Sequence, residues 1–156
     1  MSNRVLAACM AVLFLALGVH LHPLEPSIVV LQFTFSEAAF QAVLRAWGIA
    51  GVALYRSHFP ADFVLLLCYG TWGIVQGRAW AGRARGRTHA AGLVWTLPLA
   101  AVADAVENAV HLSLMDDQGG AAAWWYAAAG GAAALKWLGI VLFIVVAAAL
   151  NRSLRR

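Results

Sequence analysis

The sequence predicts an all-α integral membrane protein: a bundle of four transmembrane helices with an amphipathic helix in its outer loop. Of the 156 residues, 63% are hydrophobic and only 12% are charged, whereas about 25% of a soluble domain is charged. Four long apolar segments run along the chain, and basic residues gather between them. The length suits one domain, residues 1–156. The net charge of +4 does not indicate a nucleic-acid partner, because the basic residues lie at predicted membrane edges.

The four predicted spans cover about residues 5–21, 60–77, 93–115 and 123–150. Each is close to the roughly 20 apolar residues that cross a bilayer as a helix. Gly73 and Gly77 form a GxxxG spacing in the second span, and the fourth contains AAAGGAAA at 127–134. Small residues let helices approach closely in a membrane, so both stretches predict tight helix packing.

An amphipathic segment is predicted between the first two spans, at residues 36–58, and it begins SEAAFQAVLRAWG. Ser36 suits a helix N-cap, and Gly48 suits a helix end. Apolar residues recur at the spacing of one helix face, namely Phe40, Val43, Leu44 and Trp47. The pattern fits either a helix on the outer membrane surface or a lid over a pocket that faces outward.

The predicted orientation follows from the basic residues. Ten of the eleven are Arg, and Lys136 is the single lysine. Eight of them flank the spans on one side: Arg4, Arg78, Arg83, Arg85, Arg87, Arg152, Arg155 and Arg156. Basic residues concentrate on the cytoplasmic side of membrane proteins. We therefore expect both termini and residues 78–92 to be cytoplasmic. The Arg-rich and Ala-rich composition suggests a high-GC bacterium, and hence the bacterial inner membrane.

The third span carries an unusual polar stretch, ADAVENAVH at 103–111. At 100° per residue, Asp104, Glu107, Asn108 and His111 fall within one arc of about 100° on the helix. A charged side chain at the bilayer centre costs roughly 2.5–3.5 kcal/mol on insertion scales. This face is therefore predicted to point into the bundle or into a wet cavity.

Other spans offer polar partners at matching depth. Lys136 lies near the middle of the fourth span and is predicted to meet Asp104 at the midplane. Asp62 and His20 lie near the outer ends of their spans, at the predicted level of His111. Two further polar residues follow Asp62 on one helix face, seven and fourteen positions later: Tyr69 and Gln76.

This arrangement predicts an intramembrane pocket, open to the outer leaflet, for an isoprenoid-like, sterol-like or acyl lipid. A desolvated carboxyl tends to remain protonated, which makes Glu107 the candidate general acid. Asp104 is expected to be held ionised by Lys136, and His111 to relay a proton. The catalytic candidates are Glu107, Asp104, His111 and Asp62, for isomerase or cyclase chemistry, and the ligand-binding candidates are Asn108, Tyr69, Lys136, Trp72 and Gln76.

Three alternatives remain open at this stage. His20, His111 and Asp62 are candidate ligands of a divalent metal, or the two histidines of haem, because His is the commonest metal ligand. The polar face also suits proton-coupled transport. Finally, a buried polar network can fix helix register without chemistry. The sequence determines neither a cofactor nor an oligomeric state.

Two stretches carry a family resemblance, HFPADFVLLLCYG and LPLAAVADAVENAVHL. They resemble a set of small bacterial four-span membrane proteins of unsettled function. In that set Asp-Phe lies near the start of span two, and span three carries Asp-x-x-Glu-Asn. The topology is also similar to that of the EXPERA group, which includes the emopamil-binding sterol isomerase. The resemblance implies a four-span fold and assigns no residue roles.

Overall fold

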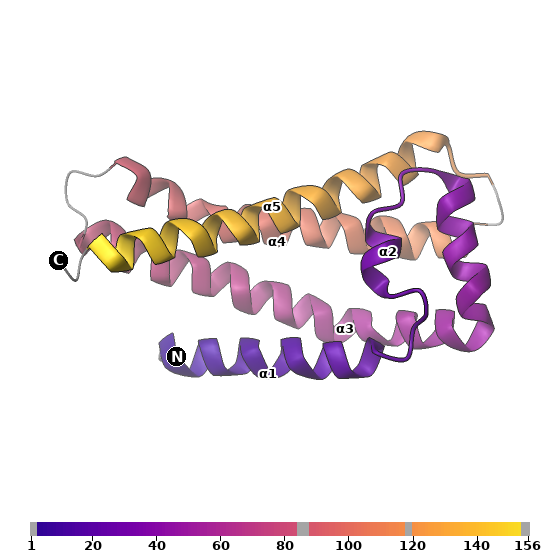
Figure 1. Ribbon diagram of the computed structural model, residues 1–156, viewed down its shortest axis with the longest axis horizontal. Coiled ribbons are helices and arrows are strands. Elements are labelled where there is room, and N and C mark those ends of the chain that lie inside the picture. The colour runs from indigo at the N-terminus through magenta and orange to yellow at the C-terminus, as the bar shows by residue number, and fades with distance from the viewer. Residues whose placement is uncertain (1–2, 84–87, 118–119, 154–156) are drawn as a thin grey trace.

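The computed structural model describes residues 3–83, 88–117 and 120–153, and in these ranges all regular structure is α-helical. The five helices are α1 (Asn3–Leu21), α2 (Ile28–Gln32), α3 (Glu37–Arg83), α4 (Thr88–Asp116) and α5 (Ala123–Ser153). Four of them, α1, α3, α4 and α5, are long and apolar enough to cross a membrane. The predicted all-α class is therefore confirmed (Figure 1).

Helix α3 has two arms that meet at Gly48, whose φ of 61° and ψ of −175° lie outside the helical range. Glycine adopts positive φ without the steric cost that other residues meet, and Gly48 was the predicted end of the amphipathic helix. The first arm, residues 37–47, crosses the end of the bundle, and the second arm, residues 49–83, runs along it (Figure 1).

No helix end marks the predicted boundary between the amphipathic segment and the second span. Residues 49–58 belong to the long second arm of α3, so this arm begins well before Pro60. Proline favours the first turn of a helix, which is why Pro60 marks a start in the sequence. Here Pro60 is exposed, and its ring lies on the outside of a helix that continues past it.

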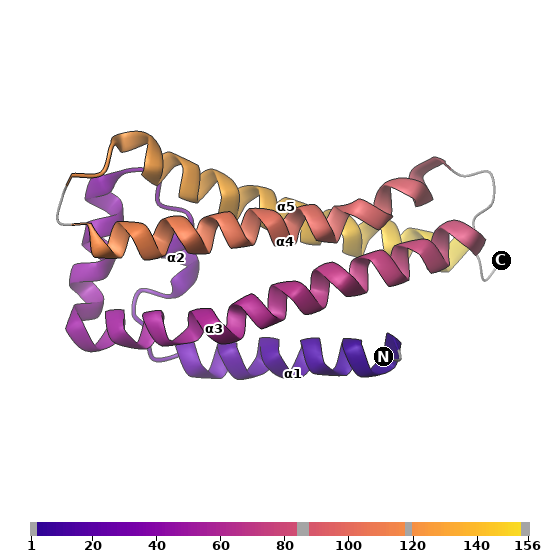
Figure 2. The same cartoon turned by 180° about the vertical axis from the view of Figure 1, so that it is seen from behind.

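Helix α4 packs against both α3 and α5, which touch each other far less. Helix α1 packs along the second arm of α3 (Figure 2). The start of α1 and the end of α5 lie toward the same end of the bundle (Figure 1), and Asn3 donates a 2.6 Å hydrogen bond to Gln76 near the end of α3. This geometry agrees with termini on one side of a membrane, and their cytoplasmic location stays a prediction.

Glycines allow the close approach of α3 to α4. A Cβ added at Gly73 would lie 2.5 Å from the Cβ of Leu97, and one at Gly77 would lie 2.7 Å from the Cα of Val94. Gly130 on α5 meets a different neighbour, since its added Cβ would lie 2.7 Å from the carbonyl oxygen of Thr34. These glycines therefore act as packing positions, as the sequence predicts.

The segment between α1 and α3, residues 22–36, is here called the strap, and it includes α2. Helix α2 contacts α3 on one side and α5 on the other, and both views place it between them on the side away from α4 (Figures 1 and 2). Leu31 is fully buried against the apolar cluster at this end, while Val29 and Val30 are about half exposed at 47% and 48%. The strap thus closes the space between α3 and α5.

Candidate functional site

The polar face of α4 points into the bundle, as predicted. Asp104 and Asn108 are 6% and 3% exposed, and Glu107 and His111 are fully buried. The α-helical spacing places all four on one side of α4. Because α4 lies between α3 and α5, this side meets polar groups from both helices.

Lys136 of α5 contacts two carboxyl groups of α4. Its Nζ lies 3.0 Å from Oδ1 of Asp104 and 2.6 Å from Oε2 of Glu107. All three side chains are less than a tenth exposed. The predicted pairing of Lys136 with an acid of α4 is confirmed, and it forms a buried ionic cluster of one ammonium and two carboxyls.

The expected division between the two acids is wrong. Asp104 was expected to pair with Lys136 and Glu107 to act as the protonated acid, yet the contact of Glu107 with Lys136 is the shorter of the two. The contact is an ion pair without the alignment of a hydrogen bond. Asp104, in contrast, accepts a hydrogen bond from Lys136 at 3.0 Å and another from the Tyr69 hydroxyl at 2.9 Å. Asp104 is thus the more fully bonded acid.

Two further predicted residues join the cluster from α3 and α4. Asn108 donates a hydrogen bond to Oδ2 of Asp62 at 2.6 Å, and Tyr69 follows Asp62 by seven residues on the same face of α3. Asp62 adds a third carboxyl to a partly enclosed region that contains a single ammonium. The ionic cluster and Asp62 together therefore contain three carboxyl groups and one ammonium group among the described residues.

His111 lies at the end of the cluster nearer the strap and has a partner that the sequence reasoning missed. Its Nδ1 shares a 2.8 Å hydrogen bond with the buried hydroxyl of Tyr55. Phe40, from the first arm of α3, places its ring 5.5 Å from the imidazole. A signal for Tyr55 existed, since Tyr55, Asp62 and Tyr69 recur every seven residues and so share one helix face.

Three buried atoms of this face have no hydrogen-bond partner among the described residues: both carboxylate oxygens of Glu107 and Nε2 of His111. Oε2 of Glu107 is ion-paired with Lys136, which leaves Oε1 and Nε2 without any partner. The residues are four positions apart, which puts both side chains on the same face of α4, one turn from each other. Leaving a buried polar group unpaired costs about 1–3 kcal/mol. These atoms are therefore the places where the cluster can bind a polar group.

Three predicted site residues lie elsewhere. Trp72 packs against Phe143 in the apolar core, with ring centroids 5.5 Å apart and ring planes tilted by 59°. Gln76 accepts its hydrogen bond from Asn3. His20 is exposed and bonds Ser57 at 2.8 Å. The predicted binding roles of Trp72 and Gln76 therefore find no support in their positions.

The predicted metal group of His20, His111 and Asp62 is not assembled. Within residues 3–83, 88–117 and 120–153, no three His, Cys, Asp or Glu side chains lie close enough together to hold a metal ion. His111 is buried beside Tyr55, whereas His20, near the end of α1, is exposed and bonds Ser57. The two histidines that were considered as haem ligands therefore differ in both environment and partner.

A hydrogen bond joins helix α2 of the strap to α5 next to the ionic cluster. Trp137, the neighbour of Lys136, donates a 3.0 Å hydrogen bond to Oε1 of the buried Gln32 in α2. The ammonium of Lys136 lies 5.7 Å from the centroid of the Trp137 ring. The strap is thus attached to α5 at the residue next to Lys136.

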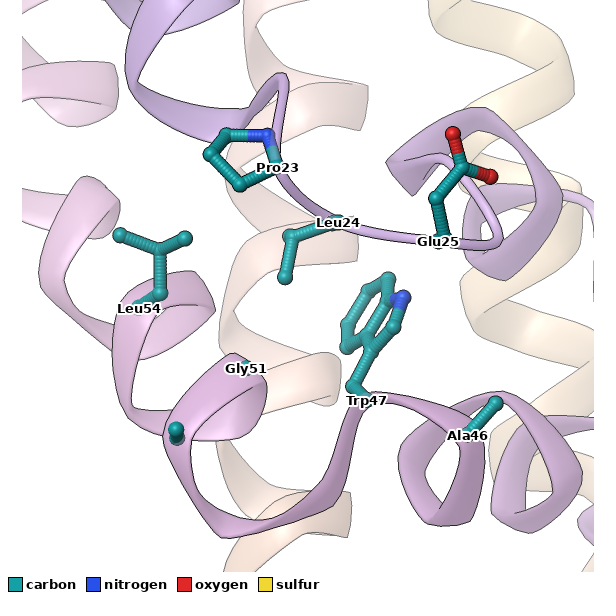
Figure 3. Close-up of a pocket in the computed structure, with 8 residues that line it drawn as sticks. Pro23, Leu24, Glu25, Ala46, Trp47, Gly51 and Leu54 are labelled. Atoms are coloured by element: carbon teal, nitrogen blue, oxygen red, sulfur yellow. The ribbon is translucent and has the colours of Figure 1, made fainter.

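A groove of about 390 Å³ lies at the bend of α3, lined by Pro23, Leu24, Glu25, Ala46, Trp47, Ala50, Gly51 and Leu54 (Figure 3). Trp47 donates a 2.6 Å hydrogen bond to the carbonyl oxygen of Pro26 and thereby ties the strap to the bend. Its ring lies 5.1 Å from that of Tyr55, the partner of His111. The groove therefore leaves free space beside the start of the strap.

Comparison with known proteins adds no assignment. No protein-family model, curated protein or solved structure matches this chain.

Proposed function

We propose that this protein binds a hydrophobic lipid inside the membrane and holds its polar end at the buried cluster of α4 for acid–base chemistry. The observation that carries the proposal is the pair of unpartnered, fully buried atoms, Oε1 of Glu107 and Nε2 of His111. A structural network would be expected to satisfy such groups internally. A carboxyl and an imidazole side by side are also the usual agents of proton transfer in enzymes.

The chemistry assigned to Glu107 differs from the sequence prediction. Because Lys136 contacts Oε2, Glu107 is placed as an ionised acceptor and base through Oε1, instead of as the protonated acid. Nε2 of His111, one helical turn away, is the other buried atom without a partner, and Tyr55 holds the ring through Nδ1. Asp104, with two hydrogen bonds, positions Lys136 and does not contact the lipid.

The proposed route for the lipid passes the strap. Helix α2 presents half-exposed Val29 and Val30 to the outside and buried Leu31 and Gln32 to the core. Three described side-chain hydrogen bonds join the strap to the bundle, from Trp137 to Gln32, from Trp47 to Pro26 and from the Ala39 amide to Ser36. Displacement of α2 would open the space between α3 and α5 toward the acyl region of the bilayer. The predicted orientation places this opening in the outer leaflet of a bacterial inner membrane.

The test compares lipids that co-purify with the wild type and with two variants. Glu107→Gln keeps the side-chain shape and removes the buried charge, and Glu37→Gln makes the same chemical change at an exposed position at the start of α3. We expect mass spectrometry to find one lipid class enriched over bulk membrane lipid in the wild type and in Glu37→Gln. That enrichment should be lost in Glu107→Gln.

Thermal midpoints of all three proteins separate loss of binding from loss of fold. The proposal is overturned if folded Glu107→Gln retains the same lipid at the wild-type level. It is equally overturned if the wild type carries only the lipid mixture of its membrane.

A further inference from the structure

The unpartnered atoms of the cluster have opposite hydrogen-bonding needs. The Tyr55 hydroxyl is a stronger proton donor than a neutral imidazole, so we assign its proton to the 2.8 Å bond with Nδ1 of His111. The neutral ring then carries its own proton on Nε2. This N–H lacks an acceptor, while Oε1 of Glu107, bound to no donor among the described residues, lacks a proton.

One oxygen atom can satisfy both groups. Side chains four residues apart on a helix have Cβ atoms about 5–6 Å from each other, a spacing that a single hydroxyl can bridge. We propose, on the basis of the proposed function, that the polar end of the bound lipid is a hydroxyl group. It donates its proton to Oε1 of Glu107 and accepts the N–H of His111.

Other common lipid head groups fit the site less well. A phosphate or a carboxylate would meet three nearby carboxyls, those of Asp62, Asp104 and Glu107, against the single ammonium of Lys136. A protonated amine has donors only, so it would leave the N–H of His111 unpaired. A methyl ether accepts a hydrogen bond but cannot donate one to Glu107.

Two sources can supply the hydroxyl, namely a lipid alcohol or a water molecule, and matched probes distinguish them. Hexadecan-1-ol, its methyl ether and hexadecyl phosphate are titrated against the full-length protein in detergent micelles, with thermal stabilisation as the readout. We expect the alcohol to bind about 10-fold or more tightly than the ether, because a buried carboxylate is otherwise left unpaired. The phosphate should bind more weakly still.

Variants test whether the preference comes from these two residues. In His111→Phe and in Glu107→Gln the ratio of alcohol to ether affinity should fall toward one. Ser113→Ala, an exposed change on the same helix that removes only a bond to the Ala109 carbonyl, should keep the ratio. Because Glu107→Gln preserves shape, it tests the proposal even where His111→Phe does not fold.

The outcomes separate this inference from the proposed function. Equal binding of the alcohol and the ether, with lipid still retained by the purified wild type, indicates water at the site and overturns the hydroxyl assignment alone. A preference for the phosphate also overturns it. If the purified wild type retains no specific lipid and binds no probe, both proposals fail.

Discussion

Replacing Lys136 with methionine tests the ionic cluster most directly. The change removes the ammonium that lies 3.0 Å from Asp104 and 2.6 Å from Glu107, while methionine retains much of the side-chain volume. At an effective dielectric constant of about 20, each contact corresponds to a Coulomb attraction of roughly 5–6 kcal/mol. Desolvation of the charges offsets much of this attraction. Removing one partner of a buried ion pair nevertheless costs about 3–5 kcal/mol, because the other partner is left uncompensated.

We therefore expect Lys136→Met to lower the free energy of unfolding by about 3–5 kcal/mol. The triple variant Lys136→Met, Asp104→Asn, Glu107→Gln should recover most of that loss, because it leaves no buried charge in the ionic cluster. The Tyr69 hydroxyl can still donate to an asparagine oxygen at position 104.

The measurement is reversible unfolding in mixed micelles with rising fractions of dodecyl sulfate, followed by the fluorescence of the seven tryptophans. Leu135→Met provides the control, because this neighbour of Lys136 is 63% exposed and its change should have little effect. A Lys136→Met protein within about 1 kcal/mol of the wild type would refute the reasoning, since it falls well below the cost of an unpaired buried charge. So would a triple variant less stable than the single one.

Two other predictions concern packing and topology. Gly77→Ala should destabilise the protein by about 1–3 kcal/mol in the same unfolding assay, because the new Cβ would lie 2.7 Å from the backbone of Val94. Gly131→Ala is the control and should not destabilise the protein, because a Cβ there would meet nothing within 4 Å. Equal stability of the two variants would show that the approach of α3 to α4 is looser than described. For topology, Cys9 and Cys68 are first replaced by alanine, and single cysteines are then placed at Arg78 and at Ala122. A membrane-impermeant thiol reagent added outside the cell should label position 122 only, and labelling of position 78 would contradict the predicted orientation.

The polar face of α4 could be predicted because periodicity alone determines which residues share a helix face. The cost of exposing Asp104, Glu107 and His111 to lipid then requires that face to point inward. The pairing with Lys136 followed from depth, since two antiparallel neighbouring spans bring their midpoints together. Each inference needs only the position of a residue along its own helix, and the sequence supplies that position.

The choice between Asp104 and Glu107 could not be made in this way. Their difference in depth is only three residues, or about 4.5 Å along the helix axis. The four-carbon stem of Lys136 is flexible and reaches both carboxyls. Which acid is closer depends on the rotation of α5 against α4, and this rotation is determined by side-chain packing that no single span encodes.

The strap was missed for a different physical reason. Helix α2 has five residues, too few for a 3.6-residue period to appear, and short helices are stable only through their tertiary contacts. Those contacts come from Gln32 with Trp137 and from the backbone of Thr34 against Gly130. The strap residues that pack against α5 can therefore be recognised only when the position of α5 is known.

The proposed route requires the strap to move while the long helices stay in place. The second arm of α3, α4 and α5 are long helices, and close contacts at Gly73 and Gly77 join α3 to α4. The strap has one short helix, and its described side-chain hydrogen bonds to the long helices are at Pro26, Gln32 and Ser36. A lipid that reaches Glu107 and His111 by displacing α2 would therefore leave the ionic cluster of Lys136, Asp104 and Glu107 intact.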